Sequence, residues 1–247
     1  MYFPRVLKCP PRTLDQHLTE HRGLYRRPPT KTGFLLRGKG FGRNPVAGRA
    51  TVEGMRIILL GATGLVGRAV AAALEPRHEI VPVSRTSPVE ADLNDPGSLD
   101  ALFETAPDAV VCCAANVPLR PLAELTDEQV LDDLRAKLLG QVALARRAAE
   151  RLPAAGSITL TGGTFTEPIP GSGLGALVNT GLAGFVSSAA AELPRGPRIN
   201  VVSPGWIAET LEAMGEDGGR GTPVAVVAEA YRALVEGDAN GRTVVPR

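Results

Sequence analysis

The chain has 247 residues, of which 44% are hydrophobic and 21% charged, and its formal net charge is +1. These values fit a globular domain with a full hydrophobic core and exclude a wholly disordered, strongly charged chain. We expect no apolar run of the roughly 20 residues that a membrane-spanning helix needs, and the N-terminus lacks the apolar segment of a secretory signal.

The first 54 residues differ from the rest in charge and composition. They carry eleven Lys/Arg against three Asp/Glu, whereas residues 55–247 carry 16 against 23, and they hold six prolines with little hydrophobic periodicity. We expect residues 1–54 to form a basic, disordered extension of one domain, residues 55–247. A basic arm can bind nucleic acid or an acidic surface, and Arg-rich leaders can direct a chain to an organelle. The alternative is that translation begins at Met55.

Beyond Met55, apolar strands alternate with helices. Strands are expected at MRIILL (55–60), HEIVPVSR (78–85), DAVVCCAA (108–115), GSITLTGG (156–163), PRINVVSPG (197–205) and GRTVVP (241–246), with a short one before Asp92. Helices are expected over 95–106, 126–151, 179–193 and 222–237, the second with Thr126 as N-cap. The pattern predicts an α/β fold, a single-domain Rossmann-type, doubly wound parallel sheet of about seven strands.

The first strand runs into the glycine turn GATGLVG and then into a helix. Glycines there let the backbone approach a pyrophosphate, and the helix N-terminus attracts its charge. Glycine also serves ordinary tight turns, but this position between strand and helix favours dinucleotide binding. The residues expected to contact the cofactor at this turn are Gly61, Thr63, Gly64, Leu65, Val66 and Gly67.

The end of the second strand discriminates between the two nicotinamide cofactors. An NAD site has an acidic residue there for the ribose 2′-hydroxyl, whereas this chain has Ser84 and Arg85. An arginine suits a 2′-phosphate, so the sequence favours NADP(H); the alternative is a solvated surface arginine. Asp92 and Leu93, in EADLND, are expected to flank the adenine, although Asp92 can equally start a turn.

The cysteines are Cys9 and the adjacent pair Cys112 and Cys113. Neighbours on a strand point to opposite faces of the sheet, so the pair forms neither a disulfide nor a metal clip, and no metal site is predicted. This cysteine usage favours the reducing cytoplasm.

These pieces, in this order, resemble the short-chain dehydrogenase/reductase family. GATGLVG resembles its glycine turn, ADLND its adenine-side motif, and VVCCAAN its NNAG motif with Ala115 in place of the glycine. INVVSPGWIAET resembles the segment after the sixth strand, whose Pro204–Gly205 turn borders the nicotinamide in that family. The resemblance covers about residues 55–247 and is strongest to a short bacterial subgroup. It implies strand order 3-2-1-4-5-6-7 and cofactor contacts from Ala114, Ala115, Pro204 and Gly205.

The catalytic side chains of the resembled family are missing. Aligned on GLAGFV, the family's tyrosine position is Gly175 and its lysine position is Asn179; its serine falls at Gly162 and its helix asparagine at Lys137. The chain holds a single tyrosine beyond residue 54, Tyr231, in the last helix. The family mechanism, in which a tyrosine protonates the substrate oxygen, is therefore not available.

Few polar side chains remain at the end of the sheet where the cofactor is expected to bind. Thr161, with Thr164 nearby, is a candidate hydrogen-bond donor to a substrate carbonyl, although such residues are often turn formers. Trp206 either walls the substrate pocket or packs in the core. The acidic residues between Glu209 and Asp217 are expected to be mostly solvated.

Lys137 is the single lysine in residues 55–247. Because it stands at the family's asparagine position while Asn179 stands at the lysine position, the two residues look exchanged. We expect the Lys137 ammonium to lie near the nicotinamide ribose beside Asn179, with partial burial lowering its pKa. The alternative is a lysine whose head group reaches solvent.

Two functions stay open at this point. The first is an NADP-dependent reductase of a small-molecule carbonyl or enone with a remodelled proton path. The second is a catalytically silent NADP-binding sensor or scaffold protein. Helices 126–151 and 179–193 are expected to pair in a homodimer or homotetramer, because the later helix is rich in small residues. A membrane is not expected as a partner, and a nucleic acid is suggested by the basic arm alone.

Overall fold

The structure is a computed structural model that describes residues 54–114 and 116–247. The basic extension expected over residues 1–54 thus lies outside the described residues, except for Gly54, and so does the predicted cofactor contact Ala115.

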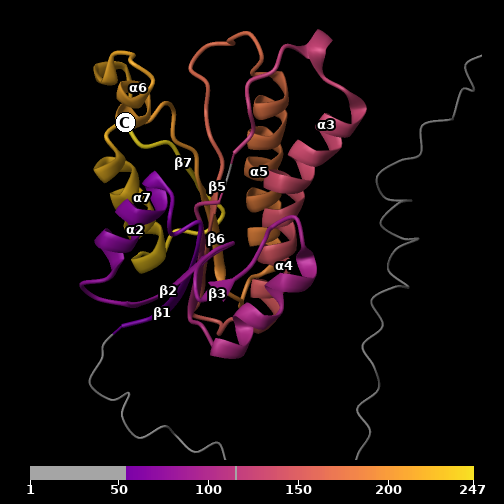
Figure 1. The fold of residues 1–247 in the computed structure, drawn as a ribbon. Helices are drawn as coiled ribbons and strands as arrows, with labels where there is room; N and C mark the ends of the chain where they lie inside the picture. The colour runs from indigo at the N-terminus through magenta and orange to yellow at the C-terminus, as the bar shows by residue number, and fades with distance from the viewer. Residues whose placement is uncertain (1–53, 115) are drawn as a thin grey trace, which may run out of the picture. The chain divides into compact units, whose positions relative to one another are not determined.

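Seven parallel strands form one sheet in the order β3-β2-β1-β4-β5-β6-β7, which confirms the predicted fold class and strand order (Figure 1). The strands are β1 (Arg56–Leu60), β2 (Glu79–Ser84), β3 (Val89–Glu90), β4 (Ala109–Cys112), β5 (Ser157–Thr161), β6 (Arg198–Val202) and β7 (Thr243–Val244). Because all pairs are parallel, the loops after β1, β4, β5 and β6 emerge at the same edge of the sheet. That edge is where open α/β sheets bind ligands.

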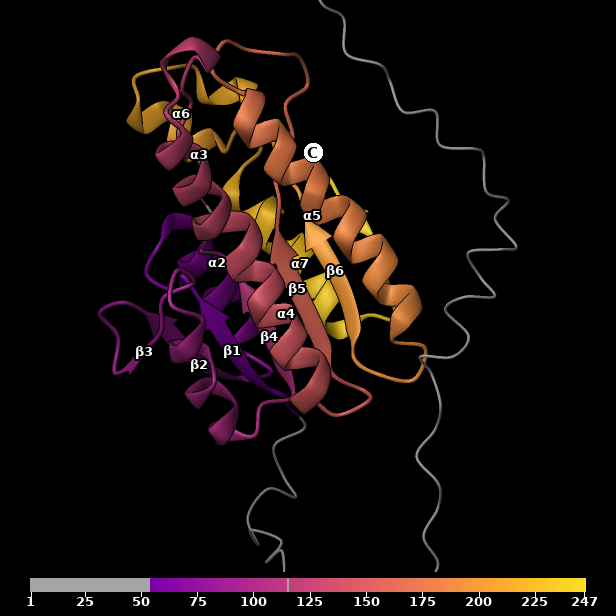
Figure 2. The same ribbon diagram turned by 90° about the vertical axis from the view of Figure 1, so that its right-hand side faces the viewer.

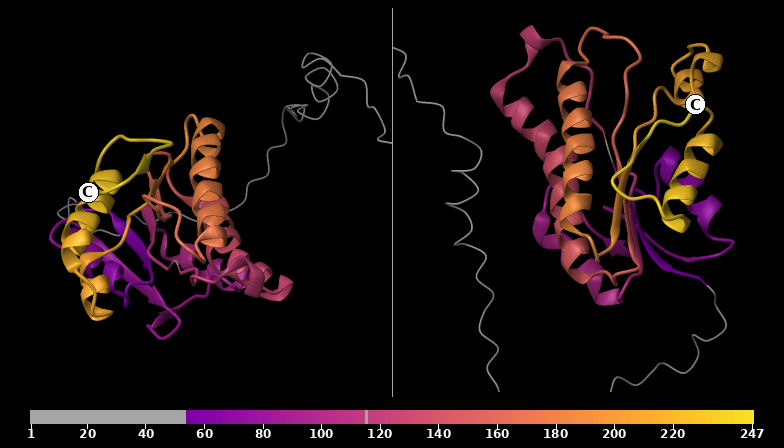
Figure 3. Two further views of the ribbon diagram at one scale, coloured as in Figure 1. Left: turned by 90° about the horizontal axis from the view of Figure 1, so that it is seen from above. Right: turned by 180° about the vertical axis from the view of Figure 1, so that it is seen from behind.

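Helices cover both faces of the sheet, as continuous apolar strands require. α2 (Leu65–Leu74) and α7 (Val224–Glu236) lie on one face, and α4 (Gly140–Arg151) and α5 (Gly173–Glu192) lie on the other (Figures 1 and 3). α3 (Asp127–Asp133) and α6 (Ala208–Ala213) stand beyond the ligand-binding edge of the sheet (Figure 2). In place of the helix expected over 95–106, the chain makes two 3₁₀ turns, Pro96–Leu99 and Ala101–Thr105.

The sheet separates two hydrophobic cores, because alternate residues of each strand face opposite sides. Ile58 and Leu60 join the core beneath α4 and α5, whereas Ile57 and Leu59 join the core beneath α2 and α7. The cysteine pair obeys the same alternation: Cys112 packs in the first core and Cys113 against the second.

The helix predicted over 126–151 is continuous but irregular. It begins with the expected N-cap, in which Thr126 Oγ1 accepts from the Gln129 amide at 3.2 Å and Gln129 Oε1 accepts from the Thr126 amide at 3.1 Å. Between α3 and α4 the segment Leu134–Leu139 is π-helical, and it contains the buried Lys137. Single π-helical turns inside α-helices occur frequently at functional sites.

α5 is longer than predicted, since it begins at Gly173 rather than at Asn179. It is also the one helix of the described residues whose length and apolar composition would allow it to cross a membrane, which the sequence analysis did not expect. Leu174, Val178, Leu182 and Val186 of α5 are buried, and the helix packs on β6, as a core helix does. Much of its remaining surface is exposed.

Candidate functional site

The loop between β1 and α2 is shaped by its glycines. Gly61 has φ +77°, a conformation that favours glycine, and a Cβ atom there would lie 2.6 Å from the Ala114 nitrogen. A Cβ atom on Gly67 would lie 2.0 Å from the Gly61 carbonyl oxygen. The two glycines therefore let the end of β4 and the first turn of α2 approach the loop closely.

The N-terminus of α2 is open to an anion. Gly64 is its N-cap and supplies no side-chain hydrogen bond, and the first turn has no acidic residue. Thr63 and Gly64 are exposed, while Leu65 and Val66 are partly buried. Amide groups at such a helix end are suited to a phosphate. The predicted glycine-turn residues thus lie together around one helix N-terminus.

The loop after β2 presents Arg85 to solvent. Hydroxyl groups organise this loop: Ser87 Oγ accepts from the Ser84 amide at 2.6 Å and donates to the Val89 carbonyl at 2.7 Å. Ser84 Oγ in turn accepts from the Thr86 amide at 3.1 Å. Arg85 is exposed, and its guanidinium has no hydrogen-bond or ion-pair partner within residues 54–114 and 116–247. A free arginine on an ordered loop is available to a phosphate group.

Asp92 and Leu93 lie at the next loop along the same edge. The Asp92 carboxylate accepts from the Asn94 amide at 2.9 Å and starts a turn, which is the alternative that the sequence left open. Leu93 is buried against Gly140, where a Cβ atom would lie 2.6 Å from the Leu93 carbonyl oxygen. Glycine at the start of α4 thus permits the close contact that fixes this loop.

The loop after β5 begins with two glycines. A Cβ atom on Gly162 would lie 2.4 Å from Ser203 Oγ, and one on Gly163 would lie 2.9 Å from Asn179 Nδ2. The family serine position therefore has no room for a side chain unless Ser203 moves. In its place the Ser203 hydroxyl and the Asn179 amide approach the glycine backbone.

Lys137 reaches this loop from the π-helical segment. Its Nζ donates to the Gly162 carbonyl at 3.0 Å and to Asn179 Oδ1 at 2.9 Å, so the two residues that look exchanged in sequence are in contact. The residue is only 6% exposed, which rules out a lysine head group in water. Burial lowers the pKa of Lys137 from 10.5 to about 8.

The surroundings leave this ammonium without a counter-ion among the described residues. Burial raises the pKa of the neighbouring Cys112 thiol to about 12, so that sulfur is neutral. An ammonium has three N–H donors, and two of them are engaged by Gly162 and Asn179. One donor of Lys137 therefore has no partner in the described part of the chain.

Gln141, one turn after Lys137, fixes the helix to the strand. Its Oε1 accepts from the Thr161 amide at 2.8 Å, and its Nε2 donates to the Thr161 carbonyl at 2.9 Å and to the Lys137 carbonyl at 3.1 Å. Gln141 is fully buried. It therefore holds the π-helical segment against the end of β5, and sequence reasoning did not identify it.

Thr161 does not join the group around Lys137. Ile158 and Leu160 face the core beneath α4 and α5, so alternation turns Thr161 to the opposite face. There its hydroxyl donates to the Cys112 carbonyl and lies 2.5 Å from Tyr231 Oη. Both the threonine and Tyr231 are buried. The Thr161 hydroxyl is thus engaged on the other face of the sheet, away from Lys137, and is not placed to donate to a substrate carbonyl beside it.

Gly175, at the tyrosine position of the resembled family, is covered by an aromatic ring. A Cβ atom on Gly175 would lie 3.3 Å from Cε2 and 3.4 Å from Cζ of Phe165. Phe165 comes from the loop after β5, and nothing in the local sequence predicts this contact. The space next to Gly175 is therefore apolar and has no hydroxyl group.

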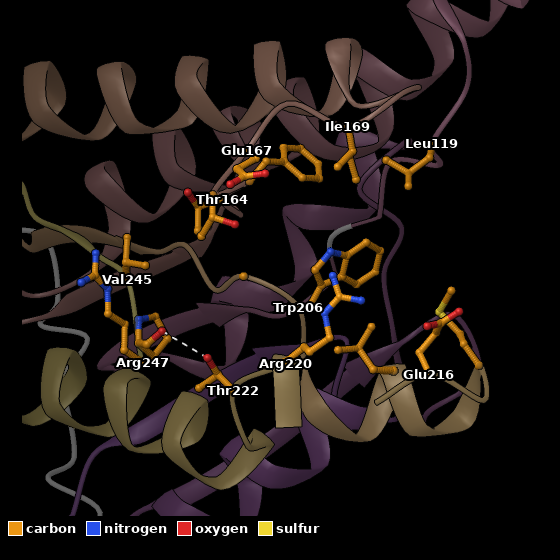
Figure 4. Close-up of a pocket in the computed structure, with 16 residues that line it drawn as sticks. Leu119, Thr164, Glu167, Ile169, Trp206, Glu216, Arg220, Thr222, Val245 and Arg247 are labelled. Atoms are coloured by element: carbon orange, nitrogen blue, oxygen red, sulfur yellow. Dashed lines mark hydrogen bonds between the residues drawn. The ribbon is translucent and has the colours of Figure 1, made fainter. Parts of the chain in front are cut away.

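A cavity of about 940 Å³ opens between the loop after β5 and the segment after β6 (Figure 4). Trp206 stands in its wall with 41% of its surface exposed, so it lines a cavity and does not pack in the core. Thr164 and Glu167 face it from one side and Arg220 from the other. Of the predicted nicotinamide contacts, Gly205 lines this cavity, and the Pro204 carbonyl accepts from the Thr164 amide at 2.9 Å.

A second cavity, of about 500 Å³, lies between α5 and β7. It shares Thr164, Phe165 and Val245 with the first cavity. Asn179 and Ser203 line it, whereas Lys137 stands behind Asn179. The two cavities are of the size that binds small molecules.

Comparisons with known proteins agree with this fold. The family model described as enoyl-(acyl carrier protein) reductase matches residues 38–235. The structure of lin1944 from Listeria innocua is 34% identical, with a TM-score of 0.73 and coverage of 77% of this chain and 98% of that one. Among curated proteins, none has a significantly similar sequence.

Two more distant structures share the fold. One is a small-chain dehydrogenase in complex with NADPH, 23% identical, with a TM-score of 0.67 and coverage of 78% of this chain and 96% of that one. The other is a short chain dehydrogenase from Burkholderia cenocepacia J2315 in complex with NADP, 21% identical, with a TM-score of 0.68 and coverage of 79% and 97%.

Proposed function

The chain belongs to the short-chain dehydrogenase/reductase family of oxidoreductases, and from this membership we propose that it reduces a carbonyl group or an enone of a small molecule with NADPH. The observation that carries the proposal is the buried Lys137 ammonium, held by Gly162 and Asn179 at the ligand-binding edge of the sheet.

The residues at that edge fit a dinucleotide. The uncapped N-terminus of α2 and the tight Gly61–Gly67 turn accept a pyrophosphate. Arg85, without an acidic partner among the described residues, fits the 2′-phosphate of NADP(H). Two structures of the same fold are complexes with NADPH and with NADP, which supports this choice of cofactor.

NADPH, when bound, supplies the hydride, and the protein has to orient the substrate and deliver a proton. Lys137 Nζ is the ionisable group we propose for the proton. Its pKa of about 8 keeps it mostly charged at pH 7 yet makes it more acidic than an ordinary lysine. Its free N–H is available to a ribose hydroxyl or a water molecule, and Asn179 holds the ammonium in place.

One observation favours a second candidate function, an NADP-binding sensor or scaffold protein without turnover. The Phe165 ring covers Gly175, and the single tyrosine beyond residue 54, Tyr231, is buried on the far face of the sheet. Within residues 54–114 and 116–247, therefore, no phenol is placed to protonate a substrate. Loss of a general acid costs about 10²- to 10⁴-fold in rate. The protein is therefore a reductase if Lys137 replaces the missing tyrosine as proton donor, and a sensor or scaffold protein if it does not.

The test is to measure NADPH consumption over a panel of carbonyls and enones, beside a direct measurement of NADPH binding. We expect turnover on at least one compound, and a loss of about 10²- to 10⁴-fold in Lys137→Met. Arg135→Met, an exposed residue of the same π-helical segment, is the matched control and should keep full activity. NADPH binding without turnover on any compound would favour the sensor.

We also propose that the protein is a homodimer or homotetramer in the cytoplasm. The exposed surface of α5 supports the assembly, because its alanines, glycines and serines permit close approach of a second helix.

A further inference from the structure

The cavity between α5 and β7 is lined by side chains without charge. Its lining residues are Gly163, Thr164, Phe165, Pro168, Ser172, Gly173, Ala176, Asn179, Thr180, Ala183, Ser203, Thr243 and Val245. The larger cavity, by contrast, includes Glu167, Glu216, Arg220 and Arg247. Burying an unpaired charge is costly, so the smaller cavity is built for an uncharged molecule.

The Asn179 side chain presents a donor to this cavity. Lys137 Nζ has donors only, so the atom 2.9 Å from it must be the amide oxygen. The amide nitrogen is thereby turned toward Gly163 and the cavity. Asn179 is 9% exposed, and its Nδ2 atom has no hydrogen-bond partner among the described residues.

Ser203 supplies a second polar group. It is 3% exposed, and its backbone is fixed by the amide that donates to the Val244 carbonyl at 2.7 Å. Its hydroxyl lies beside Gly162 and makes no hydrogen bond to another described residue. Neither atom is sealed in the interior, since Thr159 Oγ1 is the one fully buried side-chain atom without a partner among the described residues. The Asn179 amide and the Ser203 hydroxyl, on residues that are otherwise buried, therefore open into one cavity and are available to a ligand.

We propose that this cavity binds the carbonyl oxygen of an uncharged, largely apolar molecule, which accepts from Asn179 Nδ2 and Ser203 Oγ. Phe165, Ala176 and Ala183 supply apolar walls for the rest of the molecule. The ammonium behind Asn179 polarises the amide and strengthens its donor. The binding site does not depend on any reaction. That its occupant is the substrate reduced with NADPH is a further step, which rests on the proposed function.

Three probes of matched shape test the chemistry of the site. Acetophenone carries the carbonyl, α-methylstyrene replaces the oxygen by a methylene group, and benzoate replaces the acetyl group by a charged carboxylate. Affinities are measured on the full chain by ligand-observed NMR titration, without cofactor and with NADPH. We expect acetophenone to bind about fivefold or more tightly than either of the other probes.

Two variants locate the contact. Asn179→Asp keeps the shape and pairs with Lys137 but removes the amide donor, and Ser203→Ala removes the hydroxyl. Each should weaken acetophenone about five- to tenfold without weakening α-methylstyrene. Ser188→Ala, an exposed serine of α5, is the matched control and should change nothing. Melting temperatures establish that both variants are folded.

The proposal is overturned by any of three results: equal affinity for acetophenone and α-methylstyrene, tighter binding of benzoate, or unchanged acetophenone affinity in both folded variants. Absence of acetophenone binding with and without NADPH overturns it as well. None of these results depends on turnover, so the failure of this site and the failure of the proposed reductase activity are separate outcomes.

Discussion

Replacing Lys137 by methionine is expected to remove a specific dependence of stability on pH. The pKa of Lys137 is about 8 in the folded chain, against 10.5 as the ordinary value. Because the folded chain binds this proton less tightly than the unfolded chain does, the free energy of unfolding rises with pH between these two values. Below pH 8 both states are protonated, and the folded state carries the full cost of the buried charge, about 3 kcal/mol.

The expected size follows from the same pKa shift. Between pH 7 and 9.5, wild type should gain about 2 kcal/mol of unfolding free energy from this group, and Lys137→Met should gain none of it. At pH 7 the variant escapes the desolvation cost but leaves the Gly162 and Asn179 oxygens without a donor, about 1–3 kcal/mol each. The opposing effects nearly cancel, so the melting temperature at pH 7 should hardly change.

Urea unfolding of both proteins at pH 7 and pH 9.5 is the assay. The quantity compared is the free energy of unfolding of wild type minus that of the variant. Cys112 and Cys113 titrate on unfolding in both proteins, so their contribution cancels in this difference. Between pH 7 and pH 9.5 this difference in unfolding free energy should increase by about 2 kcal/mol in favour of wild type. If the difference in unfolding free energy does not change with pH, the conclusion that burial lowers the pKa of Lys137 is wrong.

Arg85 and Gly67, at the ligand-binding edge of the sheet, and the exposed surface of α5 can each be tested separately. Arg85→Ala should weaken NADP(H) binding about 10- to 100-fold and NAD(H) binding much less; equal weakening, measured by titration, would mean that Arg85 does not contact a 2′-phosphate. Gly67→Ala should lose about 1–3 kcal/mol of stability and weaken the cofactor, since its Cβ would lie 2.0 Å from the Gly61 oxygen. Gly196→Ala, outside α5, where a Cβ would make only ordinary contacts at 3.5 Å or more, is the control and should not be destabilised in denaturant unfolding. Sedimentation at micromolar concentration should show a dimer or tetramer, and a monomer there would contradict the pairing of α5 with a second subunit.

Most of the fold could be predicted because its signals are local. Apolar runs bounded by turns identified the strands, and Thr126 with its acidic first turn marked the start of a helix. The orientation of Thr161 was also accessible, since Ile158 and Leu160 alternate with it along β5. The start of α5 was missed because glycines at 173 and 175 have poor helix propensity and resemble a loop.

The rest of the site depends on contacts between distant segments. The family alignment placed Lys137 and Asn179 near each other, but the π-helical turn that directs Lys137 inward arises from packing and from the bonds of Gln141 to β5. The cover of Gly175 by Phe165 and the approach of Ser203 to Gly162 are likewise tertiary contacts. No local pattern encodes them, so they became visible only in the structure.

The most direct test of the central claim is the pH dependence of kcat/KM for NADPH-dependent reduction of the best carbonyl or enone found in the panel. If Lys137 supplies the proton, kcat/KM should be level below pH 8 and fall as pH rises through the pKa of about 8, when the ammonium is lost. Lys137→Met should be slow at every pH and lack this transition, while Arg135→Met should reproduce the wild-type profile. NADPH that binds but is not consumed, or a wild-type profile that Lys137→Met retains, would contradict the account.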